Sequence, residues 1–528
     1  MRPSVSATYR RLSIVLFAAG VFAQEKPVQL WRGMGQHHHP IVTANAEAQK
    51  YFNQGLLLLY GFNRYEAQRS FQKASELDPG AAMPHWGLAA TYAPHINMDL
   101  DGDVDLKKGC AAATIAAKLA TAEHEKAYAQ AGRAMCTSGD AYREALRALH
   151  RRYPDDPDAA SLFAEALMVP VRWRWFADGK PAGEMAACIG VLEQVMKRDP
   201  DHPGANHFYI HAMEMSPNPE YALPSAQRLM GGIAPGAGHL VHMAGHTYFR
   251  VGDYEVVASS NERAVQVDEH YFHHSGVHGG YVGYYAHNLH FLTAARMMQG
   301  RFDDAYQAAE KMVERLKPML NEMAALADPF VATPVFVLER FRKWDEILKL
   351  PEPEARLPVT RAMWRYARVL AYVGKGDRAK AAAEAREFEA AKARVPADAP
   401  FINNKASSIL EIAAEVIAAR MAGDAASAVP HWRKAAAIQD GLTYDEPPPW
   451  YYPLRESLGA ALLRAGKVEE AERVFRDDLD RYPRNGRSLF GLMHALKARK
   501  DDAGAEWVKM EFDKAWKRAQ TGLSLDTF

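Results

Sequence analysis

Apolar and small residues recur along this chain at intervals of three, four and seven positions, and alternation of apolar and polar residues is rare. The stretch "GKVEEAERVFRDDLDRYP" (466–483) shows the pattern, with Ala471 and Phe475 four positions apart. The stretch "FNRYEAQRSFQKASELDP" (62–79) repeats it. Intervals of three and four place side chains on one face of an α-helix, whereas a half-buried strand needs alternation. The pattern therefore predicts an all-α protein.

The helical pattern also repeats as a unit. "GDYEVVASSNERA" (252–264) and "GRFDDAYQAAEKM" (300–312) both follow a glycine turn with an aromatic residue and then small residues. This arrangement resembles the tetratricopeptide repeat, a helix hairpin of about 34 residues. The resemblance implies a right-handed α-solenoid of tetratricopeptide-like hairpins, and a non-repeating helical bundle is the alternative. The repeats are clear at 50–80, 238–268, 286–315 and 452–500, and degenerate at 110–200 and 316–440.

The first residues have the pattern of an export signal. Basic residues precede an apolar stretch at 12–22, which predicts a signal peptide over 1–23 that is cleaved after Ala23. An uncleaved membrane anchor is the alternative, and Arg10-Arg11 is a weak match to a twin-arginine signal. We therefore expect a periplasmic or secreted protein, with no membrane span after the signal is removed.

Three stretches are similar to a group of bacterial tetratricopeptide-repeat proteins that carry export signals. They are "HHHPIVTANAEAQKYFNQGLLLLYGFNRYEAQRSFQKASELDP", "HWGLAATYAPHINMD" and "DEPPPWYYPLRESLGAALLRAGKVEEAERVFRDDLDRYPRNGRSLFGL". This resemblance supports the fold and the location, and it transfers no catalytic residue. The expected divisions after the signal are an N-terminal extension (24–48), N-terminal repeats (49–200), histidine-rich repeats with a site and a lid loop (201–315), and C-terminal repeats (316–528).

The charge balance argues against two classes of partner. The 528 residues include 64 Lys and Arg against 64 Asp and Glu, so no basic excess exists to bind nucleic acid or an anionic membrane. The cysteines Cys110, Cys136 and Cys188 are too few for a disulfide framework. Cys110 and Cys136 could bridge neighbouring helices in an oxidising compartment, or all three thiols could be buried and free.

Histidine is the unusual residue of this chain. Twelve of the 21 histidines lie between positions 202 and 290. Within "GHLVHMAGHTYFRVGDY" (238–254), His239, His242 and His246 are spaced by three and four, so they share one stripe of a helix. The repeat pattern assigns that stripe to the concave face, where tetratricopeptide repeats bind ligands.

The two neighbouring repeats carry histidines at matching positions. Because adjacent helices pack about 8–10 Å apart, these stripes can converge. Converging imidazoles suit zinc, copper or iron, so the pattern predicts a transition-metal site. Glu214 is expected to act as a ligand or as a general base for a metal-activated water. The predicted metal ligands are His207, His211, His239, His242, His246, His287 and His290.

Other histidines receive weaker interpretations. The glycines and tyrosines of 269–285 predict a loop that closes over the groove as a lid. His202 precedes a proline at a helix start, which suggests a capping role. The tract 37–39 is expected on the surface. The weaker ligand candidates in the lid are His270, His273, His274 and His278.

Two functions remain from the sequence. In the first, the groove holds a metal ion and the protein is a metal-dependent oxidoreductase or hydrolase acting on a small molecule or peptide. The chain has no "HExxH" motif, no serine–histidine–aspartate pattern and no phosphate loop, so no known mechanism is indicated. The alternative is a non-catalytic scaffold that binds a peptide or protein partner.

Overall fold

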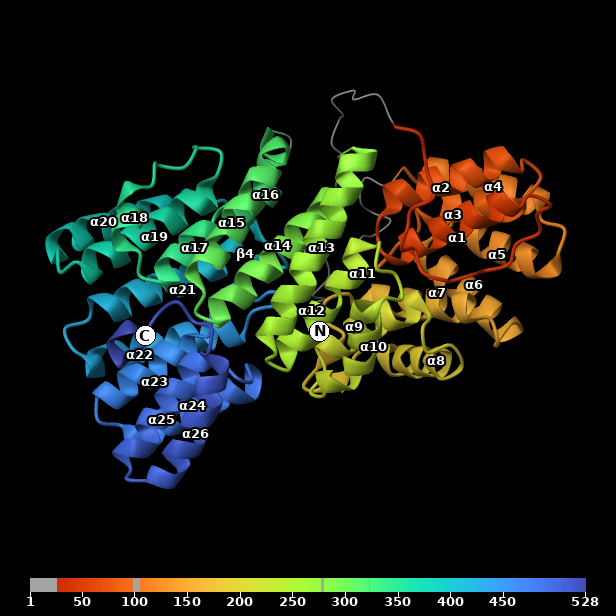
Figure 1. Cartoon of the computed structure of the whole chain (residues 1–528). Helices are drawn as coiled ribbons and strands as arrows, with labels where there is room; N and C mark the ends of the chain where they lie inside the picture. Colours follow the sequence, from red (N-terminus) through yellow and green to blue (C-terminus); the bar gives the residue numbers. More distant parts are fainter. Residues whose placement is uncertain (1–25, 98–104, 277–279, 322) are drawn as a thin grey trace, which may run out of the picture. The chain divides into compact units, whose positions relative to one another are not determined.

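The computed structural model describes residues 26–97, 105–276, 280–321 and 323–528. The chain divides into two compact units (Figure 1). The first ends at Phe208 and also takes in Ser275–Tyr281, and the second comprises Tyr209–His274 and Val282–Phe528. Helix α9 therefore begins in the first unit and ends in the second.

The first unit is built from consecutive helices with one short β-hairpin. Its antiparallel strands are β1 (Phe176–Ala177) and β2 (Lys180–Pro181). The 3-10 turn η1 (Val169–Val171) precedes them. The helices are α1 (Ala46–Tyr60), α2 (Arg64–Leu77), α3 (Ala82–Ala90), α4 (Leu106–Leu119), α5 (Glu123–Ala134), α6 (Gly139–Arg152), α7 (Pro157–Met168), α8 (Met185–Arg198) and the start of α9 (Pro203–Glu214).

Small residues opposite aromatic rings hold these hairpins together. The Phe71 ring of α2 packs against Gly55 of α1 and against Gly87 of α3. A Cβ atom at Gly55 would lie 2.7 Å from that ring, so only glycine allows this approach. One aromatic side chain thus joins its own hairpin to the next.

The cysteine question is resolved within the first unit. A disulfide joins Cys110 of α4 to Cys136, just after α5, with their Cα atoms 5.7 Å apart. Cys188 of α8 is free and buried. Of the two sequence-based alternatives, the bridge between neighbouring helices is therefore the one observed.

The second unit is again almost entirely helical. Its strands β3 (Pro400–Phe401) and β4 (Asn404–Lys405) form one short hairpin. The 3-10 turns are η2 (Pro219–Ala222), η3 (Lys317–Asn321) and η4 (Leu525–Thr527). The helices are α10 (Leu223–Gly231), α11 (Gly238–His242), α12 (Ala244–Arg250), α13 (Tyr254–Ser275), α14 (Tyr281–Met298), α15 (Phe302–Leu316), α16 (Ala324–Val331), α17 (Thr333–Arg340), α18 (Trp344–Lys349), α19 (Pro358–Gly374), α20 (Arg378–Lys392), α21 (Ala406–Met421), α22 (Ala425–Asp440), α23 (Leu454–Arg464), α24 (Val468–Arg481), α25 (Gly486–Ala498) and α26 (Asp502–Ala515).

The predicted hairpins of this unit are confirmed. Gly252 and Gly300 form the turns between their helices with φ of +76° and +71°, a backbone region that glycine tolerates best. Phe475 of α24 packs against Gly459 of α23, where a Cβ atom would lie 2.6 Å from the ring. The protein is thus an all-α solenoid of tetratricopeptide-like helix hairpins. One detail differs, because the first helix of the 238 repeat is interrupted at Met243 between α11 and α12.

The prediction that 269–285 forms a loop is wrong for the described residues. Residues 269–275 continue α13, and α14 begins at Tyr281, so most of the segment is helical. The candidates His270, His273 and His274 therefore belong to the last turns of α13, and His278 lies outside the described residues. The glycines suggested a long loop, but α13 continues to Ser275 and α14 already begins at Tyr281.

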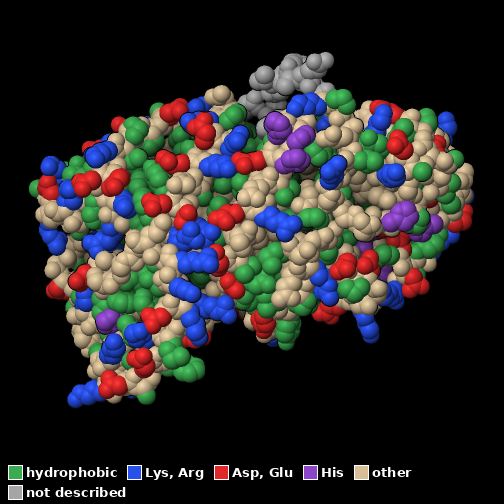
Figure 2. Space-filling view, in the orientation of Figure 1, with side chains coloured by type: hydrophobic (Ala, Val, Ile, Leu, Met, Phe, Trp, Pro, Cys, Tyr) green, Lys and Arg blue, Asp and Glu red, His purple; other side chains and the backbone are tan. Residues whose placement is uncertain are grey.

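The surface carries both signs of charge. Figure 2 shows basic and acidic side chains interspersed over the viewed face. This distribution agrees with the equal numbers of basic and acidic residues in the sequence. Among the described residues, no helix is long and apolar enough to cross a membrane.

Candidate metal centre

The histidine stripe of α11 and α12 is buried. His239, His242 and His246 expose 2%, 0% and 1% of their surface. The repeat pattern predicts that this stripe faces a ligand and does not pack in the interior, and the burial of all three rings contradicts the second part of that prediction. Helix α14 covers the stripe with Phe291. The ring centroid of Phe291 lies 4.9 Å from that of His242 and 4.7 Å from that of His246.

The hydrogen bonds of Asn261 determine the tautomer of His242. The Asn261 side-chain nitrogen donates to the carbonyl of Val257 at 2.8 Å, so its oxygen must be the atom 2.7 Å from Nδ1 of His242. Nδ1 of His242 therefore donates a proton to that oxygen. In the neutral ring, Nε2 is then left with a lone pair.

His246 presents its own Nε2 to the same point. The Nε2 atoms of His242 and His246 are 2.9 Å apart. Nδ1 of His246 lies 2.7 Å from a carboxylate oxygen of Glu214 and 2.7 Å from one of Glu446, so this nitrogen carries its proton. Two neutral rings would then direct lone pairs at each other, which requires a cation between them, either a proton or a metal ion.

His287 of α14 is the third imidazole of this cluster. Its ring centroid lies 4.8 Å from that of His242 and 5.6 Å from that of His246. One nitrogen of each of the three rings lies within 4.8 Å of the others. His287 is partly exposed, whereas His242 and His246 are fully buried. Three helices thus bring three histidines to one point.

Electrostatics keep two of the three rings neutral. Burial, together with the charge of His246, lowers the pKa of His242 well below its ordinary 6.5. Burial and the neighbouring histidines have the same effect on the pKa of His287. Burial also opposes protonation of His246, but the charge of Glu214 outweighs it and raises that pKa to about 9. Without a metal ion, a second proton on His246 therefore provides the cation that the two facing Nε2 atoms require.

Two buried carboxylates flank His246. Glu214, at the end of α9, lies between two imidazoles, with one oxygen 3.2 Å from Nδ1 of His211 and the other 2.7 Å from Nδ1 of His246. Burial raises its pKa, but the charges of these two histidines overcome burial and lower the pKa to about 2. Glu214 is therefore ionised and positioned to orient its histidine neighbours.

Glu446 was not predicted from the sequence. It lies in the proline-rich connector before α23, outside any repeat, so no periodic signal marks it. Burial, and then the charge of Glu214, raises the pKa of Glu446 to about 7. Among the described residues neither of its oxygens has a well-directed hydrogen-bond donor, although one lies 2.7 Å from His246.

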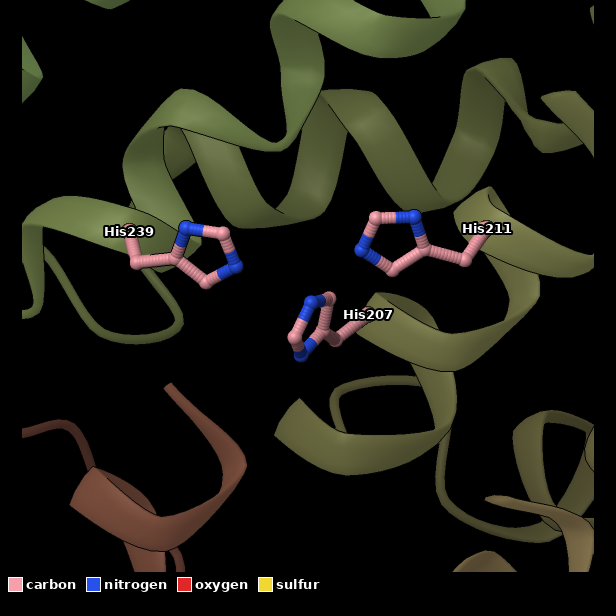
Figure 3. A group of neighbouring side chains, drawn as sticks. All are labelled: His207, His211 and His239. Atoms are coloured by element: carbon pink, nitrogen blue, oxygen red, sulfur yellow. The ribbon is translucent and has the colours of Figure 1, made fainter. Parts of the chain in front are cut away.

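A second pair of predicted ligands lies beside this cluster. Figure 3 shows the imidazoles of His211 and His239 pointing toward one another. One nitrogen of each lies within 4.8 Å of the other. His239 also stacks on His242, with centroids 5.4 Å apart, and its edge meets Tyr284. These two rings thus extend the histidine cluster within the second unit.

Two predicted ligands make other contacts. His207 belongs to the first unit, where its Nδ1 lies 2.6 Å from the carbonyl oxygen of Tyr60. His290 of α14 directs Nε2 to the hydroxyl of Tyr451 at 2.7 Å, and burial lowers its pKa to about 3. The structure therefore does not bring His290 into the cluster of His242, His246 and His287.

The first unit contains a separate buried cluster around Asp158. One Asp158 oxygen accepts from Tyr60 at 2.6 Å, His37 at 3.0 Å and His202 at 3.1 Å. The other accepts from His39 at 2.8 Å. The prediction that 37–39 is a surface tract is therefore wrong for His37 and His39, whose side chains turn inward to satisfy a buried carboxylate, and holds for His38, which is exposed.

His202 also has the capping role that the sequence suggested. Its Nδ1 accepts the backbone N–H of Ala205 at the start of α9, at 3.0 Å. Nδ1 is then unprotonated, so Nε2 carries the proton that it donates to Asp158. A neutral His202 with this tautomer has no free lone pair for a metal ion. The cluster around Asp158 is thus a hydrogen-bonded structural network.

Fold and site together define an all-α array of helix hairpins that buries a histidine–carboxylate cluster in its second unit. No protein-family profile matches the chain, and no curated protein matches it. Among solved structures, a human IFIT1 dimer with m7Gppp-AAAA is similar over 90% of this chain and 91% of its own, at 11% identity and a TM-score of 0.34. Yeast Tom70 is similar over 86% and 96%, at 11% identity and a TM-score of 0.32.

Proposed function

We propose that this protein binds one transition-metal ion through His242, His246 and His287. The observation that carries the proposal is the approach of two Nε2 atoms to 2.9 Å. The other nitrogen of His242 donates to Asn261, and the other nitrogen of His246 lies 2.7 Å from a carboxylate oxygen of Glu214. Metal-binding histidines characteristically use their second nitrogen in this way, since a carboxylate or carbonyl partner sets the tautomer and the ring orientation.

The spacing also suits a metal ion. Imidazole ligands lie about 2.0–2.1 Å from zinc, so two of them in a tetrahedral site are roughly 3.3 Å apart. A separation of 2.9 Å is close to that value, and small side-chain rotations would reach it. Neutral imidazoles suit zinc, copper and iron, which are therefore the proposed metals.

The arrangement of the three histidines would allow catalysis as well as metal binding. Three protein ligands leave one coordination position for a substrate, as in catalytic metal sites. We therefore favour a metal-dependent oxidoreductase or hydrolase that acts on a small molecule or peptide. Each carboxylate oxygen of Glu214 already lies against an imidazole, one against His211 and the other against His246. We therefore assign Glu214 the role of orienting His246 in preference to that of a general base.

Metal analysis of the purified protein tests the proposal. Expression with zinc, copper and iron supplied should yield about one ion per chain, as expected for a three-histidine site. Removing the ion with a chelator should lower the melting temperature, because a ligand that binds only the folded state stabilises it. His431→Ala, which removes a half-exposed histidine paired with Glu415, should keep full metal content. Protein that neither retains nor takes up any of the three metals would leave the peptide- or protein-binding scaffold as the function.

A substitution at Asn261 should weaken metal binding without removing a ligand. Asn261→Ala deletes the acceptor that holds the proton on Nδ1 of His242, so affinity should fall about 10–100-fold. Asn261→Asp keeps an acceptor there and should retain most of the affinity. Competition titration against a chromogenic chelator measures both variants. Equal affinities for the alanine and wild-type proteins would show that Asn261 has no part in metal binding.

A further inference from the structure

The second unit contains a cavity of about 380 Å³, apart from the histidine cluster. Ligand pockets in proteins range from about 300 to 1,000 Å³, so this cavity has room for a small molecule. Helices α17, α19, α21, α22 and α23 contribute to its wall, and Thr527 of η4 lines one side.

Positive charge dominates the wall of this cavity. Its acidic lining residues are Glu339 and Asp424. Its basic lining residues are Arg340, Arg342, Arg420, Arg464 and Arg487. A concentration of guanidinium groups in a partly enclosed space attracts anions, because the low surrounding dielectric strengthens each interaction.

Carboxylates compensate only part of this charge. Glu456 binds Arg340 at 3.0 Å and Arg487 at 2.9 Å. The last residues of the chain accept from two further arginines: Arg342 donates to the main-chain oxygen of Asp526 at 2.7 Å, and Arg420 donates to a terminal carboxylate oxygen of Phe528. Among the described residues, Arg342 has no carboxylate within ion-pair distance, so its charge remains available to a ligand. Arg420 already contacts a carboxylate oxygen, which is the kind of atom that such a ligand would present.

Aromatic rings hold these arginines in place. The guanidinium of Arg342 lies 5.5 Å from the ring centroid of Trp344, and that of Arg420 lies 4.9 Å from that of Trp432. Stacking of this kind fixes the plane of the guanidinium, so less freedom is lost when a ligand binds. Burial and the charge of Arg420 lower the pKa of Arg342, which agrees with an excess of positive charge.

We propose that this cavity binds a small organic dianion, carrying either two carboxylate groups or a phosphate group, through Arg342 and Arg420. Planar guanidinium groups pair with such oxyanions through two parallel hydrogen bonds. Arg464, which donates to the carbonyl of Leu525 at 3.1 Å and lies 3.7 Å from a carboxylate oxygen of Asp526, also lines the cavity. The cavity is lined by no histidine of the metal cluster, so the anion site and the metal site can be tested independently of each other.

Thermal shift and calorimetry on the purified chain test this site. Succinate is the dicarboxylate probe and glycerol 3-phosphate is the phosphate probe, each against sodium chloride at equal ionic strength. At least one probe should bind saturably and raise the melting temperature by about 3 °C or more, and the stronger of the two identifies the oxyanion. Arg342→Gln and Arg420→Gln should each lower the affinity at least about tenfold, since each removes one charged fork.

A matched variant controls for the loss of a positive charge. Arg386 of α20 is exposed and lies outside the cavity, so Arg386→Gln should bind the probe like the wild type. Circular dichroism establishes whether each variant is folded. Because there are two cavity variants, the test remains valid if one of them fails to fold. No saturable shift beyond that of sodium chloride, or equal binding by both cavity variants and the control, would overturn the proposal.

Discussion

Replacing His242 and His246 together by alanine is expected to abolish metal retention. The double variant loses two of the three proposed ligands and leaves only His287, so the affinity should fall by at least about a thousandfold. Elemental analysis of the purified variant should then detect little metal, where the wild type holds about one ion per chain. Retention of full metal content would rule out these residues as the binding site.

The structure changes what this substitution should do to stability. The repeat spacing predicts His242 and His246 as groove residues outside the core, but both are buried against Phe291. Truncating them leaves a cavity, which should cost about 2–4 kcal/mol in addition to the lost metal. Phe291→Leu is the matched control, because it disturbs the same packing and keeps every proposed ligand. It should lose stability and retain the metal.

Asp158→Asn should be the most destabilising single substitution in the first unit. The buried carboxylate accepts hydrogen bonds from Tyr60, His37, His39 and His202, and an amide would direct its own N–H groups at some of these donors. Breaking a buried, charged network in this way costs about 3–5 kcal/mol. Denaturant titration, with hydrogen exchange on peptides from 31–60, measures the loss and where it occurs.

A neighbouring aspartate provides the control for this prediction. The Asp155 side chain is 90% exposed and pairs with Arg198, so Asp155→Asn should change stability by less than about 1 kcal/mol. If the two variants were equally stable, Asp158 would not be holding the N-terminal segment.

The network around Asp158 should also make stability depend on pH. Burial opposes ionisation of Asp158, but the adjacent histidines lower its pKa well below the ordinary 3.8. Its contribution is therefore present above pH 3.8 and is lost as the pH falls through the lowered value. Burial lowers the pKa of His37 and His39, but Asp158 raises both above 6.5 overall, so their contribution is lost as the pH rises through the raised values. Asp158→Asn should flatten this profile.

The sequence by itself determined the class of fold. Ala471 and Phe475, four positions apart, could pack only as one face of a helix, and the glycines at 252 and 300 marked the turns of their hairpins. These features are local, because helix periodicity and a positive φ depend on residues close together in the chain. For that reason the hairpins could be predicted, whereas the interruption at Met243 could not.

The sequence also identified the histidines that belong together, but not their environment. The shared stripe of His242 and His246, and the matching position of His287, followed from repeat spacing. Their partners Asn261 and Glu446 carry no such signal, because Asn261 lies on the next helix and Glu446 in a connector about 200 residues away. Spacing within one helix says nothing about which distant side chain packs opposite it.

Only the tertiary structure decided whether each histidine is buried, and which atom it presents. The repeat pattern assigned His242 and His246 to the concave, ligand-binding face, yet the packing of α14 covers them. The same pattern gave His290 the same role as His287, but Tyr451, from a distant connector, provides it with a different hydrogen bond. Burial and tautomer arise from contacts between segments far apart in sequence, so they exist only once the chain has folded.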